Sequence, residues 1–81
     1  MVMISEFVVL EGSLLEGTRL EEVIDEYNVK ILHFHSPKID SETGNHYNPK
    51  QIIGKYFLLK VIGSDEAVKK LRLDSVKYKP N

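Results

Sequence analysis

Two histidines at alternate positions, followed by a polar stretch that contains a third, are the residues of this sequence best suited to chemistry. His33 and His35 are separated by one residue, and Asp40, Glu42 and His46 follow. Imidazole nitrogens and carboxylate oxygens at such a spacing can chelate a divalent metal ion. In a cleft, the same imidazoles would instead bind an anionic ligand, and that binding would depend on pH. Histidines spaced in this way on a half-buried strand are more often plain surface or interface groups, so we expect no metal site.

The other charged residues are typical of a solvated surface. One group of carboxylates lacks the alternating oxygen ligands and the glycine turn of a calcium loop. Its members are Glu21, Glu22, Asp25 and Glu26. Four lysines are interspersed with acids, which favours an ordinary surface over a phosphate patch; they are Lys55, Lys60, Lys69 and Lys70. No nucleophile has a base at a recognisable spacing, and no pair of carboxylates has apolar neighbours, so we expect a non-catalytic protein.

Length and composition limit the class of protein. A chain of 81 residues forms one domain that buries about 60% of its unfolded surface, and a dimer would extend so small a core. It has no cysteine, and its 11 basic and 12 acidic residues give a net charge of −1, which argues against nucleic-acid binding. No apolar run approaches the roughly 20 residues that span a bilayer. We expect a soluble cytoplasmic domain without direct membrane insertion, either free-standing or part of a longer polypeptide.

The elements that would position the histidines begin with a strand and a helix. Residues 4–10 are mostly β-branched or aromatic and predict a strand with apolar residues on both faces. After a turn with two glycines, Thr18 and Glu21 have the spacing of a capping box, which predicts a helix from Thr18. Its apolar residues recur at helical spacing through Tyr27, and Asn28 is suited to a left-handed C-cap.

The histidines themselves fall on a second predicted strand, residues 29–35. Strict alternation places Ile31, His33 and His35 on one face. Residues 36–49 carry prolines and turn residues and predict a long hairpin arm, with a short strand at about residues 46–48.

The last predicted strand, residues 55–62, has one wholly apolar face and one face that includes Lys60. We expect the first face in the core and the second against a partner or at a partly solvated surface. Ser64 then caps a short helix. The fold class is α+β, a β-α-β-β-β-α domain with a mainly antiparallel four-stranded sheet and two helices on one face. We place the domain at residues 1–72 and a C-terminal tail or added edge strand at 73–81.

Over residues 7–71 the sequence resembles the TrkA-C (RCK-C) regulatory domain of potassium channels and transporters. The resemblance rests on short motifs in a matching order: Glu11-Gly12-Ser13, Gly17-Thr18-Arg19-Leu20, Pro49, Gly54 and Ile62-Gly63. Family members commonly have Gly-Asp where this chain has Gly54-Lys55, and often an arginine where it has His35-Ser36. The second departure leaves the ligand specificity of this chain open.

The resemblance implies a cytoplasmic regulatory module that forms a homodimer and requires no cofactor. In some members a small anionic ligand, such as the cyclic dinucleotide cyclic di-AMP, lies between the two copies. Its partner would be a membrane potassium channel or transporter subunit, or a Rossmann-type regulatory domain, which would place it at the inner face of the membrane. The chain lacks a G-x-G-x-x-G motif of its own. We expect Ile31, His33, His35 and Asn45 to line the ligand cleft.

Two alternatives remain open. A ferredoxin-like module of the ACT type, which binds amino acids or assembles a metabolic enzyme, would need a further strand after the second helix, and residues 75–79 could supply it. A metal-binding protein that uses the histidines would be stabilised thermally by zinc or nickel.

Overall fold

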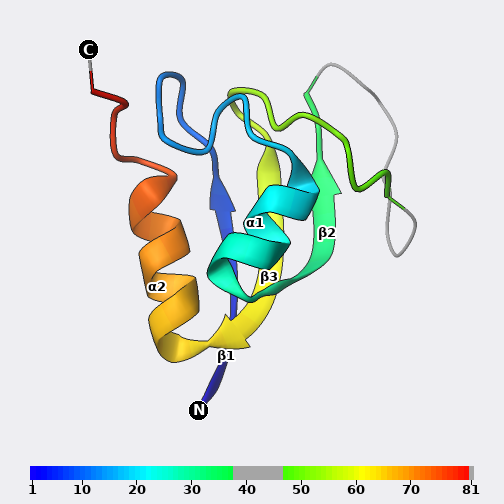
Figure 1. The fold of residues 1–81 in the computed structure, drawn as a ribbon, viewed down its shortest axis with the longest axis vertical. Helices are drawn as coiled ribbons and strands as arrows, with labels where there is room; N and C mark the ends of the chain where they lie inside the picture. The colour runs from blue at the N-terminus through cyan, green and yellow to red at the C-terminus, as the bar shows by residue number, and fades with distance from the viewer. Residues whose placement is uncertain (38–46, 81) are drawn as a thin grey trace.

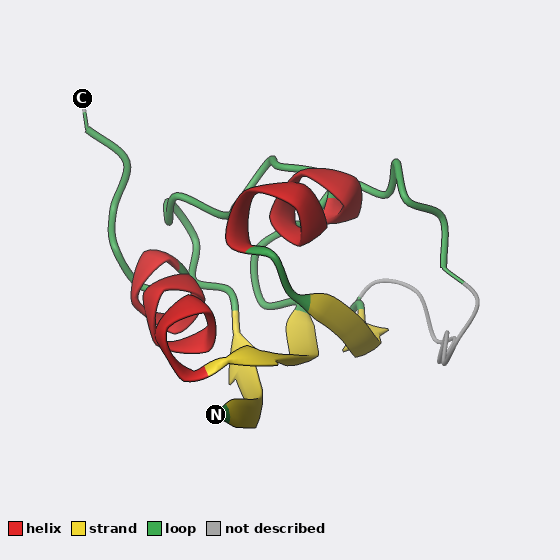
Figure 2. Cartoon of the chain, turned by 60° about the horizontal axis from the view of Figure 1, so that its bottom comes forward, coloured by secondary structure: helices red, strands yellow, loops and turns green. Residues whose placement is uncertain are grey.

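The chain forms a three-stranded antiparallel sheet that is covered on one face by two helices. The computed structural model describes residues 1–37 and 47–80. Its elements, in order, are β1 (Val2–Val8), α1 (Leu20–Tyr27), β2 (Lys30–His35), β3 (Leu58–Ser64) and α2 (Asp65–Asp74) (Figure 1). The strand order is β1-β3-β2, so the last strand in the sequence lies in the middle. Figure 2 shows both helices on the same side of the sheet.

The α+β class and the two helices on one face are therefore confirmed, but a fourth strand is not part of the sheet in the described residues. The expected short strand falls partly on His46, which lies outside those residues, and Asn48 is in no strand. Residues 51–53 run beside the start of α1 instead. Leu20 N–H donates to the carbonyl of Gln51 and Ile53 N–H to that of Thr18, at 3.0 and 2.7 Å.

The core lies between the sheet and the helices. On β3, Leu59 and Val61 are fully buried, which confirms the face that the sequence assigns to the core. From the helices, Leu20, Val68 and Leu71 are fully buried against them. Burying side chains of this kind contributes roughly 1.5–3 kcal/mol each, so this layer is a large favourable term in the stability of the domain.

Two of the three predicted helix caps are found in the structure. Asn28 takes the left-handed conformation at the end of α1, with φ 55°, and the hydroxyl of Ser64 accepts from Ala67 N–H at 3.1 Å at the start of α2. The capping box at Thr18 is wrong, because α1 begins at Leu20 and the Thr18 hydroxyl donates to the Leu15 carbonyl at 2.7 Å. The turn before the helix therefore uses that hydroxyl.

The C-terminal residues pack on the loop between β1 and α1. Ser13 and Tyr78 form an isolated bridge, and the N–H of Leu14 donates to the Lys77 carbonyl at 2.9 Å. Helix α2 continues to Asp74, two residues beyond the boundary expected after residue 72. The tail does not add to the described sheet, so the extra strand required by the ACT-type alternative is not found there.

Candidate functional site

A bulge in β2 decides which of the predicted site residues lie together. Ile31 is paired with Val61, and His33 is paired with Lys60, which is adjacent to Val61 on β3. The residue of β2 between Ile31 and His33 therefore has no partner on β3. An extra residue in one strand turns the following side chains to the opposite face. Ile31 therefore faces the core and is 7% exposed.

The two histidines lie on the other face of the sheet. His33 and His35 are partly exposed, and their partners on β3 are Lys60 and Leu58. The expectation that Ile31 shares their face is wrong because strict alternation ignores the bulge. Asn45, the fourth predicted residue, lies outside the described residues, as do Asp40, Glu42 and His46. In the part of the chain that is described, no three metal-binding side chains come together.

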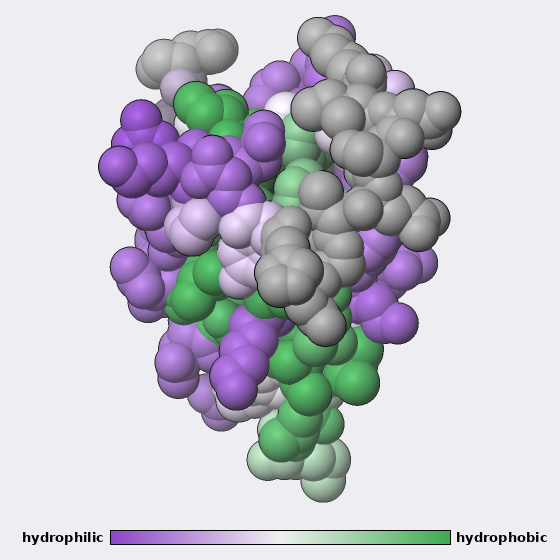
Figure 3. Space-filling model, turned by 90° about the vertical axis from the view of Figure 1, so that its right-hand side faces the viewer, coloured by the Kyte–Doolittle hydropathy of each residue, from purple (hydrophilic) through white to green (hydrophobic). Residues whose placement is uncertain are grey.

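We call the face of the sheet that carries these histidines the open face, because neither helix covers it (Figure 2). It also carries alternate residues of the edge strand β1, namely Val2, Ile4, Glu6 and Val8, which are exposed. Figure 3 shows apolar side chains gathered toward the end of the molecule where Figure 1 places the N-terminus. The imidazoles and the Lys60 ammonium thus lie beside an apolar surface, a combination that suits a ligand with anionic groups and flat apolar rings.

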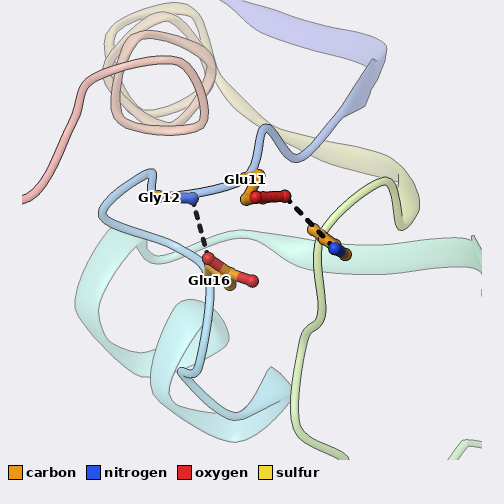
Figure 4. Close-up of polar contacts among 4 residues, drawn as sticks. Glu11, Gly12 and Glu16 are labelled. Atoms are coloured by element: carbon orange, nitrogen blue, oxygen red, sulfur yellow. Dashed lines mark hydrogen bonds and ion pairs between the residues drawn. The ribbon is translucent and has the colours of Figure 1, made fainter.

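The loop that precedes α1 is held by polar contacts at one end of the sheet (Figure 4). The Glu16 carboxylate accepts from Gly12 N–H at 2.7 Å, and Lys55 pairs with Glu11 at 3.2 Å. The hydrogen bond to Glu11, and then its charge, raise the pKa of Lys55. Lys55 is the residue that stands where the resembling family commonly has aspartate, and here it joins the turn before β3 to the loop after β1.

A second polar cluster, which the sequence did not reveal, joins the two helices. The buried hydroxyl of Tyr27 donates to Asp74 Oδ2 at 2.6 Å, and Lys70 Nζ lies 3.6 Å from the same oxygen. Burial, followed by the hydrogen bond and the charge of Asp74, raises the pKa of Tyr27 far above its ordinary value. These residues border a cleft of about 340 Å³. Because Tyr27 and Asp74 are 47 residues apart, no local pattern could have paired them.

Comparison with known proteins gives fold neighbours only. No protein-family model and no curated protein matches the sequence. Among solved structures, the chain is similar to the RCK_C domain dimer of S. agalactiae BusR in complex with c-di-AMP, with a TM-score of 0.71 and 14% identity over 91% of this chain and 90% of that one. It is also similar to BusR in complex with its busAB-promotor DNA, with a TM-score of 0.71 and 15% identity, covering 89% of this chain and 35% of that one.

The second similar protein is GsuK. Its RCK domain matches with a TM-score of 0.65 and 14% identity, and the chain covers 16% of that structure's length. The GsuK channel bound to NAD matches with a TM-score of 0.64, and the chain covers 13% of it. The chain thus corresponds to one part of these longer proteins. In its described residues no helix is long and apolar enough to cross a membrane. With the β1-β3-β2 sheet and both helices on one face, this chain has the fold of an RCK_C domain.

Proposed function

We propose that this chain is a non-catalytic regulatory domain that forms a homodimer and binds an anionic ligand between its two copies. The observation that carries the proposal is the open face, on which His33, His35 and Lys60 lie beside exposed apolar residues in an RCK_C-like fold. The similar domain of BusR is a dimer in complex with c-di-AMP. A cyclic dinucleotide has two phosphates and two flat bases, which match cationic and apolar neighbours on one surface.

The proposed role is to pass a change of dimer geometry to an attached or associated protein. A ligand that binds one geometry more tightly shifts the population toward it. We propose that the recipient is a potassium channel or transporter, or the Rossmann-type domain that regulates one, and that the domain acts in the cytoplasm. Support comes from the resemblance in the sequence and from the match to the GsuK channel.

We propose that the chain itself does not bind DNA or NAD. The net charge is −1, and the cationic groups of the open face are few. BusR binds promoter DNA as a longer protein, of which the chain covers 35%. The GsuK channel that binds NAD is longer still, and this chain lacks the glycine-rich motif with which a Rossmann fold holds a dinucleotide.

Isothermal titration calorimetry of the full chain with cyclic di-AMP tests this function. We expect saturable binding with one ligand for each pair of chains. His35→Ala should weaken it about tenfold or more, because a hydrogen bond to a charged group contributes roughly 1.5–3 kcal/mol. Lys69→Ala is the matched control, since Lys69 lies on α2 and pairs with Asp65 on the same helix.

The absence of heat and of any thermal stabilisation, with cyclic di-AMP at millimolar concentration, would contradict a cyclic dinucleotide as the ligand. Equal affinities of the wild type, His35→Ala and Lys60→Met would contradict the open face as the site.

A further inference from the structure

The open face is unusually apolar for a surface that no described element covers. Val2, Ile4 and Val8 on β1 are 70%, 57% and 42% exposed. On the neighbouring strand β3, Leu58 and Ile62 are partly exposed on the same face. The uncovered face of an antiparallel sheet is normally polar, and contiguous apolar patches of this kind usually mark an interaction site.

The register of the strands arranges this face in three rows across the sheet. The outer rows are largely apolar; one contains Ile4, Ile62 and Lys30, and the other contains Val8, Leu58 and His35. The middle row is polar throughout and contains Glu6, Lys60 and His33. The middle row is therefore a line of polar groups across the strands, from the carboxylate of Glu6 on β1 to the imidazole of His33 on β2, and Lys30 adds a cation at the edge of one outer row.

We propose that a second copy of this chain packs on the open face, about a twofold axis that runs along β3. This inference rests on the proposed dimer and specifies its interface. Two copies of a sheet that pack face to face with their strands aligned can be related by a twofold axis along the strands or by one across them. An axis across the strands would place Glu6 opposite the partner's Glu6 and His33 opposite the partner's His33. An axis along β3 instead places Glu6 opposite the partner's His33, twice by symmetry.

The chosen axis also brings the two copies of Lys60 together near the centre. Each Lys60 lies directly across the sheet from its own Glu6, so its flexible stem can turn the ammonium toward that carboxylate. Phosphate groups of a ligand between the copies would neutralise both ammonium groups, which explains how a ligand would strengthen the dimer. Charge pairs in such an interface fix its orientation more than its affinity.

The size of the face predicts a weak dimer. Three strands about 4.8 Å apart and seven residues of about 3.3 Å each give a footprint of roughly 15 by 23 Å. The area buried per copy then lies at the low end of specific interfaces, below the roughly 800 Å² of a standard one. We therefore expect association in the micromolar range or weaker, and tighter association when the ligand is present.

A charge exchange tests the interface and its axis. Sedimentation equilibrium from 10 μM to about 1 mM would compare the wild type with Glu6→Lys, His33→Glu and the double variant that carries both changes. We expect each single variant to weaken association about tenfold, because Glu6→Lys removes the carboxylate that lies opposite the partner's His33, and His33→Glu places two carboxylates opposite one another. The double variant places a lysine opposite a glutamate, with the two charges exchanged between the strands, and should recover most of the affinity. Glu22→Lys, an equal charge change on the exposed surface of α1, should leave association unchanged.

Circular dichroism and thermal melting would confirm that all variants fold. A wild-type dimer that is indifferent to both single changes overturns the interface, and loss in the single variants without recovery in the double variant overturns the axis. Calorimetry with cyclic di-AMP separates a wrong interface or a wrong axis from failure of the proposed function. If only the interface or the axis is wrong, the ligand still binds with one molecule for each dimer, and the two copies are arranged differently. A wild type that stays monomeric to 1 mM, with and without cyclic di-AMP, overturns both.

Discussion

Removal of the Tyr27 hydroxyl tests the polar link between the two helices. Tyr27 and Asp74 are 8% and 7% exposed, and the hydroxyl donates to Asp74 Oδ2 at 2.6 Å. A hydrogen bond to a charged group contributes roughly 1.5–3 kcal/mol, and Tyr27→Phe leaves the buried carboxylate of Asp74 with its ion pair to Lys70 but without the hydroxyl. We expect the free energy of unfolding near pH 8 to fall by about 2 kcal/mol. For a domain of this size, that is a fall in Tm on the order of 10 °C.

The same hydroxyl gives the loss a pH signature. In the folded chain the pKa of Tyr27 lies well above its ordinary value of 10.0, because burial and then Asp74 disfavour the phenolate. Above pH 10 the unfolded chain binds fewer protons than the folded one, so stability falls as pH rises, and the contribution is complete below pH 10. At pH 11 the wild type should have lost about 1.4 kcal/mol from this group. The phenylalanine variant has no such loss, so the difference should shrink below about 1 kcal/mol.

Urea unfolding at pH 8 and pH 11 measures both effects. Tyr78→Phe is the matched control, since Tyr78 is 71% exposed. A difference between the wild type and Tyr27→Phe that is the same at both pH values would refute a raised pKa of Tyr27 in the folded chain. So would a cost at pH 8 no larger than that of Tyr78→Phe.

Substitutions at Gly63, Ser13 and Ser64 test local packing and helix capping, each by chemical denaturation. A Cβ at Gly63 would lie 2.8 Å from Val29 Cγ1, so Gly63→Ala should cost about 1–3 kcal/mol, and Val29→Ala should recover part of it; additive losses would contradict this contact. Ser13 is fully buried and its hydroxyl has no hydrogen-bond partner among the described residues, so Ser13→Ala should stabilise the fold by about 1 kcal/mol rather than destabilise it. Ser64→Ala should cost about 1 kcal/mol, because it removes the cap on Ala67 N–H, and an unchanged stability would argue against that cap.

The parts of the fold that the sequence predicted are those that depend on neighbours in the chain. The buried face of β3 follows from the alternation of Leu59 and Val61, and the caps at Asn28 and Ser64 follow from residue type. The predicted helix start at Thr18 was wrong because the Thr18 hydroxyl can either cap a helix or donate to the preceding turn. In the structure it donates to the Leu15 carbonyl.

The candidate site was predictable in part for the same reason. His33 and His35 share a face because they are two residues apart, and they lie after the bulge, where alternation holds again. The place of Ile31 could not be predicted, since the bulge depends on how β2 pairs with β3, whose residues are far away in the sequence. The link between Tyr27 and Asp74 likewise depends on how α1 packs against α2.

The measurement that tests the central claim most directly is sedimentation equilibrium of the wild-type chain with and without cyclic di-AMP, at protein concentrations that span the association. A ligand held between two copies must tighten their association, and by the same linkage the dimer must bind it more tightly than the monomer. We predict a dimer whose association constant rises at least about tenfold when the ligand is saturating. An association constant that the ligand leaves unchanged would contradict a regulatory domain that senses its ligand between two copies.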